Sequence, residues 1–303
     1  MALIAAIALL LDAAIGWPAA IYARIGHPVT WLGRLIATLD GALNRGRGRR
    51  WKGALAALLV VAAALVPAAL LQLWLGPWVA AVLAWPLVAA RSLDDHVQAV
   101  ARPLAAGDLP AARAATAMIV GRDVTQADEA ALARASLESL AENASDGVIA
   151  PLFWAAIGGL PGIAAYKAIN TLDSMIGHRT PRHEAFGAFA ARLDDVANLI
   201  PARLTALLFV AVAGRGAGHA ARCAWEDASA HRSPNAGWPE AAMAGTLGVR
   251  LSGPRLYADR VADEPWLNGA ARDPGAGDLA RGLGLYRRGV LLFGALLVVL
   301  AAI

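Results

Sequence analysis

The 303-residue chain contains little cysteine, little lysine and little charge. Cys223 is its one cysteine, which excludes a disulfide framework and a metal site built from several cysteines. Lysine occurs at positions 52 and 167 alone among 27 basic residues, so arginine carries nearly all the positive charge. Charged residues make up 17% of the chain and apolar residues 58%. This composition is typical of a polytopic membrane protein and not of a soluble domain of this length.

Several motifs that identify nucleotide or metal enzymes are also absent. There is no GxxxxGK[ST] phosphate loop and no strand-bounded GxGxxG, so any nucleotide site is of another kind. No pair of histidines at helical spacing with an acid indicates zinc. The CDP-alcohol transferase pattern fails, because Asp146-Gly147 is followed by Val-Ile-Ala-Pro. We also expect no nucleic-acid partner.

Uninterrupted apolar runs predict the segments that cross a membrane. Four firm candidates are 2–22, 53–74, 76–91 and 285–303. The stretch 53–90 carries no charge, and as one helix it would be about 57 Å long, nearly twice a hydrocarbon core of roughly 30 Å. We therefore expect it to fold back at Leu75-Gly76-Pro77, with Trp74 and Trp78 in the outer interface.

Two further apolar segments, 147–169 and 196–213, are predicted to be broken or re-entrant. Gly158–Gly162 cuts the first into pieces of about ten residues, each too short to cross a membrane. Such breaks are allowed where the freed backbone groups are buried in protein or line a cavity. The alternative is one kinked span that carries 170–195 outside. Asp12, within the first span, either caps a broken helix or joins a site.

The remaining segments are polar. Residues 23–52 carry seven Lys and Arg against one acid, Asp40, whose replacement we expect to have little effect. The positive-inside rule makes this segment a cytoplasmic loop, and contact with anionic lipid is compatible with that placement. A cytoplasmic helical insert at 92–146 includes a helix over 126–143, and 215–284 is a polar loop segment.

These segments together predict an all-α, polytopic integral membrane protein. It has about four firm transmembrane helices, one or two broken or re-entrant helices, and cytoplasmic helical and loop segments. We expect residues 1–303 to form a single membrane-embedded domain. Its expected place is the cytoplasmic (inner) membrane, as a multi-pass protein whose active site faces the cytoplasm.

Polar motifs within the apolar background carry a family resemblance. They are ENASDGVIAPLFW, YKAINTLDSMIG, ARLDDVANLIPARLT, HPVTWLG, GDLPAAR followed by MIVGRD, and HRSPNAGWPEAAMAGTLGV. In these motifs, which cover most of the chain, it resembles the adenosylcobinamide-phosphate synthases of cobalamin biosynthesis, which are integral membrane proteins. The resemblance implies an ATP-dependent amide ligase that joins aminopropanol, free or as its O-phosphate, to adenosylcobyric acid.

Acidic, amide and basic side chains of these motifs are the candidate site residues, because such groups at membrane depth are by default functional. The candidate ligands of Mg²⁺, which favours hard oxygen donors, are Asp173, Asp194 and Asp195. The candidate catalytic residues are Glu142, Asp146 and His231. The candidate substrate or phosphate ligands are Arg122, Asn143, Asn170, Arg192, Asn198, Arg203, Arg232, Ser233 and Asn235.

Some of these groups have simpler interpretations. Glu138 and Glu142, four residues apart on one helix face, can hold Mg²⁺ or form a solvated face. Arg122 can bind phosphate or pair with Asp123. A histidine in a loop, such as His231, is more often structural than catalytic.

Two functions of other classes also fit the sequence. One is a transporter for corrinoids or other small molecules, built on the broken helices. The other is a membrane scaffold for neighbouring membrane-bound corrinoid enzymes. Inverted internal symmetry would favour transport, and the sequence shows none. The ligase requires Mg²⁺ and ATP, and membrane lipid surrounds the protein in all three cases.

Overall fold

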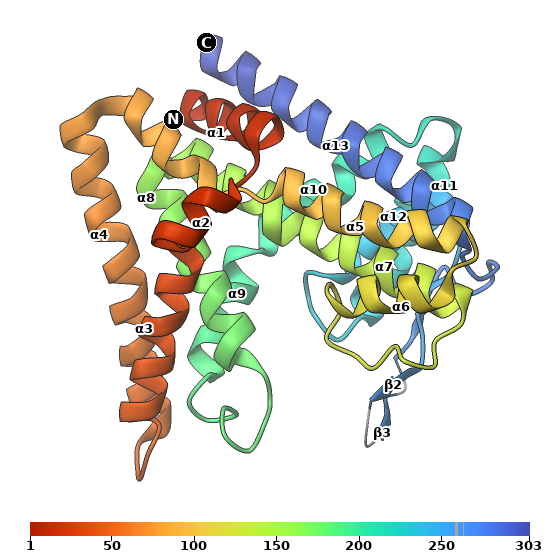
Figure 1. Ribbon diagram of the computed structural model, residues 1–303, viewed down its shortest axis with the longest axis horizontal. Helices are drawn as coiled ribbons and strands as arrows, with labels where there is room; N and C mark the ends of the chain where they lie inside the picture. The colour runs from red at the N-terminus through yellow and green to blue at the C-terminus, as the bar shows by residue number, and fades with distance from the viewer. Residues whose placement is uncertain (258–259, 263) are drawn as a thin grey trace. The chain divides into compact units, whose positions relative to one another are not determined.

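The computed structural model describes residues 1–257, 260–262 and 264–303; at residue 19 and in 255–257 and 260–262 it describes the backbone alone. Nearly all regular structure in this part of the chain is helical (Figure 1). The α-helices are α1 (Ala2–Ile15), α2 (Ala19–Ile25), α3 (Pro28–Leu43), α4 (Arg49–Ala84), α5 (Ala90–Ala105), α6 (Leu109–Ala117), α7 (Glu129–Asn143), α8 (Ala150–Leu172), α9 (Ala188–Ala197), α10 (Leu199–Ala211), α11 (Ala217–Asp227), α12 (Gly237–Leu247) and α13 (Ala276–Ala302).

Short elements complete the described structure. The 3₁₀ turns are η1 (Trp85–Leu87), η4 (Gly214–Gly216) and η5 (Ala228–Ala230), and the π-helical turns are η2 (Ala144–Ile149) and η3 (Asp173–Gly177). The strands β1 (Leu251–Ser252) and β4 (Trp266–Leu267) form one antiparallel pair, and β2 (Arg255–Tyr257) and β3 (Arg260–Ala262) form another.

The chain divides into two compact units that interleave along the sequence. Unit 1 contains Met1–Ala89, Ala150–Asn198 and Gly294–Ile303, and unit 2 contains Ala90–Ile149 and Leu199–Phe293. Each unit is therefore assembled from separated stretches, and no single cut of the chain isolates either one. The expectation of one domain over the whole chain stays a prediction.

Three helical stretches are long and apolar enough to cross a membrane: Arg49–Ala105, Glu129–Gly177 and Ala276–Ala302. A fourth candidate is a pair of helices bent by 106°, Ala2–Ile15 with Ala20–Leu43. By length and composition these are the helices of a membrane protein. The predicted first span is shorter than expected, because α1 ends where the backbone turns at Gly16 with φ 63°.

The predicted fold-back of the long apolar run lies within α4. Its 36 residues would measure about 54 Å as one straight helix, but the backbone leaves the helical region at Gly76, with φ 76° and ψ 179°. Figure 1 shows the chain turning at this end of α4. The helix then ends at Ala84, and η1 separates it from α5, so the predicted span 76–91 is not one uninterrupted helix.

A second reversal interrupts α8 at Gly159, where φ is 64° and ψ is −146°. A Cβ atom placed on Gly162 would lie 2.2 Å from the carbonyl oxygen of Trp154, whereas residues eight apart in an unbroken helix are about 12 Å apart. The two arms of α8 therefore fold back on each other, as the glycine-rich sequence predicts. The amide that the break frees, Leu160 N, donates to Gln72 Oε1 of α4 at 2.7 Å, so this donor is satisfied within the protein.

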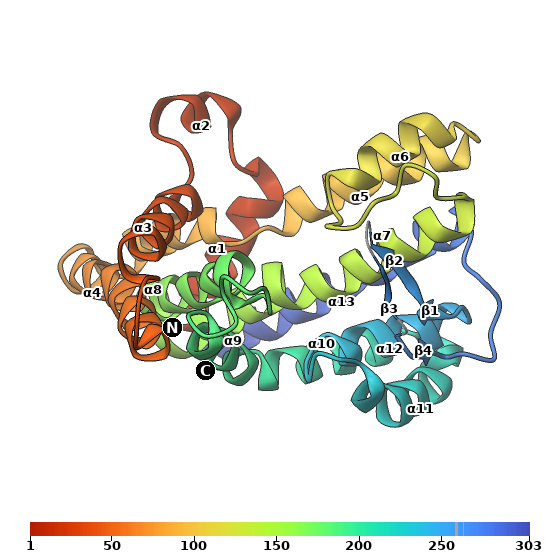
Figure 2. The same cartoon turned by 90° about the horizontal axis from the view of Figure 1, so that it is seen from below.

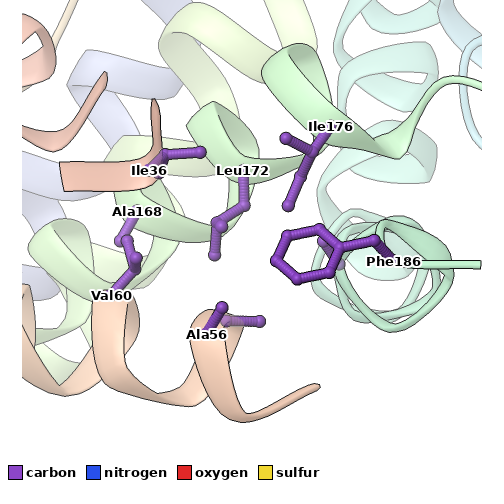
Figure 3. Close-up of a cluster of buried hydrophobic side chains, with 9 residues drawn as sticks. Ile36, Ala56, Val60, Ala168, Leu172, Ile176 and Phe186 are labelled. Carbon is purple, nitrogen blue, oxygen red and sulfur yellow. The ribbon is translucent and has the colours of Figure 1, made fainter. Parts of the chain in front are cut away.

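A cluster of buried apolar side chains holds α8 and η3 against α3, α4 and α9. It consists of Ile36, Ala56, Ala57, Val60, Ala168, Leu172, Ile176, Phe186 and Ala190, most of which are labelled in Figure 3. Leu172 and Ile176 flank Asp173 in the sequence, so the cluster fixes the segment that carries this carboxylate. A Cβ atom on Gly53 would lie 1.9 Å from Phe186 O, so the absence of a side chain there lets the backbone after η3 lie directly on α4.

The basic segment 23–52 is mostly helical and not the loop that we expected. His27 caps the start of α3: its Nδ1 accepts from Val29 N and its backbone N–H donates to Thr30 Oγ1, which forms a capping box. Asp40 on α3 is 8% exposed and bonded to other side chains. We therefore expect the replacement of Asp40 to lower the stability of the protein, in place of the little effect expected from the sequence.

In unit 2, α5 lies beside α6 and α11 lies beside α12 (Figure 2). The start of α7 corrects the prediction of a helix from residue 126. Asp123 Oδ1 accepts from both the backbone N–H and the hydroxyl of Thr125, which holds that residue in a turn. The helix begins at Glu129 instead, capped by Asp128 Oδ1, which accepts from Ala131 N at 2.8 Å.

Candidate functional site

Unit 1 brings together the three carboxylates that the sequence predicts as metal ligands. Asp173 begins η3, whereas Asp194 and Asp195 lie in α9, and η3 packs against α9. The negative charge of Asp173 acts on Asp194, and that of Asp195 acts on Asp173. The three acids therefore share one electrostatic environment, although they come from two separate motifs.

Asp194 is the most buried of the three, with 8% of its surface exposed. Its Oδ2 accepts from Asn198 Nδ2 at 3.0 Å, but its Oδ1 is buried with no hydrogen-bond donor among the described residues. Burial raises the pKa of Asp194 to about 7, the charge of Asp173 adds to the rise, and the amides of Asn198 and Asn170 oppose it. A buried carboxylate with one bare oxygen is stabilised by a cation.

Basic residues that sequence analysis did not select lie next to this cluster. Burial raises the pKa of Asp195, and the positive charge of Arg179 opposes that rise. His178 likewise interacts electrostatically with Asp173 and favours the charged form of that carboxylate. A Cβ atom on Gly177 would lie 1.9 Å from Asp173 Oδ1, so this glycine leaves room for the carboxylate. In the sequence both basic residues directly follow the motif NTLDSMIG, and this position could have identified them as neighbours of Asp173.

The cluster is not a closed metal cage. Among the described residues, no group of three or more His, Cys, Asp or Glu side chains is arranged to hold a metal ion. Mg²⁺ commonly uses one or two carboxylates and takes its other ligands from water and substrate phosphates. The hard oxygen donors of the cluster and the bare Oδ1 of Asp194 fit such a shared ion.

The other predicted residues of unit 1 differ in accessibility. Asn170 is half-buried beside Asp194, and Arg192 is exposed on α9 with no side-chain partner among the described residues. Asn198 is 1% exposed, and both ends of its amide are engaged, since Tyr166 OH donates to its Oδ1 at 2.9 Å and its Nδ2 donates to Asp194. It therefore holds Asp194, which differs from the phosphate contact that we expected.

Unit 2 brings Arg203 of α10 to the HRSPNAGWP loop. Arg203 Nη1 lies 3.4 Å from Asn235 Oδ1, and its guanidinium lies over the Trp238 ring at 4.6 Å. Ser233 Oγ accepts from Asn235 N and Ala236 N, which shapes the turn that leads into α12. Three predicted anion ligands, separated by some thirty residues of sequence, are therefore neighbours.

His231 has a fixed orientation in this loop. Its Nδ1 accepts from Ser233 N at 3.1 Å, and its Nε2 lies 3.8 Å from Oε1 of the buried Glu240, which the sequence analysis did not select. The imidazole is itself buried. Arg232 is largely exposed, and its Nε lies 3.6 Å from Glu264 Oε1. His231 thus stabilises the loop, and the side chain of Arg232 is the more accessible of the two to a substrate.

The two acids near the end of α7 differ in exposure: Glu138 is buried and Glu142 is exposed. Arg122 Nη2 donates to Glu138 Oε2 at 2.8 Å, and Ser252 N donates to Glu138 Oε1 at 2.8 Å. Glu138 is therefore buried and bonded within the protein, which fits neither of its two interpretations, the Mg²⁺ pair with Glu142 and the solvated face. Arg122 pairs with Glu138 and not with its sequence neighbour Asp123. Glu142 itself is exposed.

Two of the predicted acids lie in π-helical turns. Asp146 is half-buried in η2, and Asp173 is half-buried in η3. Asn143 is exposed just before η2, and its Nδ2 donates to Ser139 O at 2.9 Å. Single π turns are rare and frequently occur at functional sites. Their presence in both ENASDG and NTLDSMIG is consistent with a functional role for these motifs.

Comparisons with known proteins agree with the motifs. A sequence model of the family described as "CobD/Cbib protein" matches residues 5–286. The chain is 62% identical to the "Cobalamin biosynthesis protein CobD" of Rhodobacter capsulatus over 288 residues, which cover 93% of this chain and 91% of the relative. Proteins of the same name from Rhizobium meliloti and Brucella suis are 49% and 45% identical, and cover 89% and 94% of this chain and 87% and 92% of their own lengths. No solved structure matches significantly.

Proposed function

The chain belongs to the CobD/Cbib protein family, and from this membership we propose that it acts in cobalamin biosynthesis as an ATP-dependent acid–amine ligase. The substrates are adenosylcobyric acid and aminopropanol, in its O-phosphate form, and the product is adenosylcobinamide phosphate. The observation that supports this chemistry most directly is the bare, buried Oδ1 of Asp194 beside two further carboxylates.

The reaction itself requires activation of one partner. A carboxylate and an ammonium ion do not condense at neutral pH, so the γ-phosphoryl group of ATP passes to the substrate carboxylate and gives an acyl phosphate and ADP. The amine nitrogen then attacks the acyl carbon, the C–O bond to phosphate breaks, and inorganic phosphate leaves. The charge on the transferring phosphoryl group must be neutralised. Bound Mg²⁺ would supply that neutralisation.

Unit 1 would hold the metal. Asp194 would supply one carboxylate ligand of Mg²⁺ and Asp173 or Asp195 a second, because all three carry oxygen donors within one electrostatic environment. Water and substrate phosphates would supply the other ligands. Arg192 faces the phosphates, and Asn170, whose amide acts on Asp194, helps to hold that carboxylate. The exposure of Arg192 and its lack of a side-chain partner among the described residues leave its guanidinium available.

For unit 2 we propose substrate binding and proton transfer. Arg203 with Ser233, Asn235 and Arg232 binds an anionic group of a substrate, because α10 brings Arg203 to the loop that carries the other three. Glu142 or His231 takes the proton from the incoming ammonium. Asn143 and Asp146 orient that region.

We place the protein in the cytoplasmic membrane with its active site facing the cytoplasm. The three apolar helices support membrane insertion. The cluster of arginines at 45–50 supports a cytoplasmic position for that end of α4. Lipid and other membrane-bound corrinoid enzymes are then its neighbours, and a purely scaffolding role is one alternative.

A corrinoid transporter is the second candidate, and the reversals at Gly76 and Gly159 favour it. Broken helices in transporters offer freed backbone groups to the transported solute. Here Leu160 N donates to Gln72 Oε1, so the freed donor at this break is already used. This pairing favours the ligase over the transporter.

The deciding experiment uses purified protein with adenosylcobyric acid, Mg-ATP and aminopropanol phosphate. The ligase is expected to form adenosylcobinamide phosphate, ADP and inorganic phosphate only when both organic substrates are present. With ¹⁸O in the reacting carboxylate, label is expected in the inorganic phosphate. Label in AMP would show that the carboxylate is activated by adenylation and not by phosphorylation. Corrinoid uptake into vesicles without ATP and without product would establish the transporter instead.

A further inference from the structure

We propose that Tyr166 and Asn198 form a fixed hydrogen-bond relay that determines which oxygen of Asp194 is offered to a divalent cation. Tyr166 is then a positioning residue that sequence analysis did not select. The inference rests on the proposed function, in which Asp194 is a cation ligand. It adds the residues that orient this ligand.

The relay runs in one direction through three buried side chains. Tyr166 OH donates to Asn198 Oδ1 at 2.9 Å, and Asn198 Nδ2 donates to Asp194 Oδ2 at 3.0 Å. Tyr166 and Asn198 are each 1% exposed, and Asp194 is 8% exposed. Asp194 Oδ1 is the atom left without a donor among the described residues, so the relay leaves one defined oxygen bare.

Packing holds the first member of the relay in place. The Tyr166 ring belongs to a buried cluster with Ala150 and Ala197, against which Trp154 and Ile169 also pack. Trp154 Nε1 donates to the carbonyl oxygen of Ala197 at 3.1 Å, so a second hydrogen bond joins α8 to the end of α9 separately from the relay. A buried ring in a packed cluster cannot turn its hydroxyl elsewhere at low cost.

The chemistry of an amide explains why the relay selects an oxygen. If the amide of Asn198 were flipped, its carbonyl oxygen would face the carboxylate of Asp194, and two acceptors would repel each other. The hydroxyl of Tyr166 stabilises the observed orientation, because it donates to the carbonyl end. Oδ2 therefore stays engaged, and a cation approaches Oδ1. Partners that hydrogen-bond to a metal-ligating group typically change metal affinity about 10- to 100-fold.

The test is a titration of the purified full-length protein with Mn²⁺, a paramagnetic probe for the Mg²⁺ site, followed by electron paramagnetic resonance. Tyr166→Phe should weaken binding about tenfold, and Asn198→Ala about 10- to 100-fold. Because Tyr166 acts through Asn198, the double variant should bind no more weakly than Asn198→Ala alone. Additive losses in the double variant would overturn the relay.

Trp154→Phe is the matched control. It also removes one hydrogen bond between α8 and the end of α9, but that bond does not reach Asp194, so Mn²⁺ affinity should stay within about twofold. An equal loss in Trp154→Phe and Tyr166→Phe would mean general loosening and would overturn the relay. Melting temperatures of all variants check that they are folded.

Asp194→Asn separates the relay from the proposed function. Loss of Mn²⁺ binding in this variant supports the cation site. If Asp194→Asn binds Mn²⁺ as the wild type does, the proposed ligand role of Asp194 fails, and the relay fails with it. If Asp194→Asn loses binding while Tyr166→Phe and Asn198→Ala retain it fully, the cation site stands and the relay alone is wrong.

Discussion

Arg182 donates to Asp40 Oδ2 through both Nε, at 3.1 Å, and Nη2, at 2.5 Å, which joins two residues that are 142 positions apart in the sequence. The other oxygen of Asp40 accepts from Asn44 Nδ2 at 2.7 Å, and His183 Nε2 lies 3.4 Å from it. The Arg182 carbonyl in turn accepts from Asn44 and Arg49. The segment after η3, which follows the carboxylate cluster, is thus fastened to α3 and to the start of α4.

Asp40→Ala should therefore destabilise the protein by about 1–3 kcal/mol, because it removes a buried acceptor that several donors share. The cost stays below that of a fully buried ion pair, since the Arg182 side chain is 64% exposed and can be hydrated. Asp95→Ala is the control, because Arg91 and Asp95 form an exposed pair at 3.7 Å that contributes at most about 1 kcal/mol. Melting curves in detergent measure both, and equal shifts would contradict the prediction.

The reversal in α8 offers a sharper comparison between adjacent glycines. Gly159 has φ 64°, and a Cβ atom there would lie 2.2 Å from Gln72 Oε1, whereas a Cβ atom on Gly158 would meet nothing within 4 Å. Gly159→Ala should lower the folded yield and the melting temperature, and Gly158→Ala should change neither. Adding Gln72→Ala to Gly159→Ala should recover part of the loss, because it removes the clash but not the backbone strain. Equal effects of the two alanines would argue against the reversal.

The raised pKa of Asp194 predicts how stability depends on pH in the absence of divalent cations. Its pKa is about 7 in the folded protein and about 3.9 in an unfolded chain, so the folded state binds the extra proton between these values. The stabilisation from this group is complete below about pH 4 and is lost as the pH rises through about 7. Melting temperatures of the wild type in EDTA should fall across this window relative to those of Asp194→Asn, which cannot ionise. Parallel profiles would exclude the effect.

Topology can be tested by labelling a single cysteine. Glu184 is exposed, unlike its half-buried neighbour His183, so Glu184→Cys in a Cys223→Ser background should place a reactive thiol in the segment after η3. The re-entrant arrangement predicts that an impermeant reagent added outside intact cells leaves it unlabelled. Leu75→Cys, at the predicted outer turn of α4, should be labelled. Efficient outside labelling at position 184 would replace the re-entrant arrangement by additional complete spans.

Local features of the fold were predictable from the sequence. The reversals at Gly76 and Gly159 follow from glycine close to proline within apolar runs, which is a property of a few neighbouring residues. The membrane class followed from composition. The clustering of Asp173 with Asp194 and Asp195 was anticipated because both motifs carry acids where a membrane protein tolerates few.

Pairings across long stretches of sequence were not predictable. Glu138 looked like half of a carboxylate pair with Glu142, but its partners Arg122 and Ser252 come from other elements. Asn198 looked like a phosphate ligand by residue type, yet burial and Tyr166 give it a supporting position. In each case the sequence shows the type of the residue, but its partner depends on tertiary packing.

The π-helical turn η3 gives Asp173–Gly177 one residue more than an α-helical turn would hold. Deletion of a single residue here would restore regular helical hydrogen bonding, and the local helix would tolerate it well. It would also shorten the chain between Asp173 and Arg182 by one residue, and Arg182 would be drawn away from Asp40. A substitution changes one side chain, whereas this deletion would move a contact made farther along the chain. The length of this turn is therefore as much a part of the site as the identity of its residues.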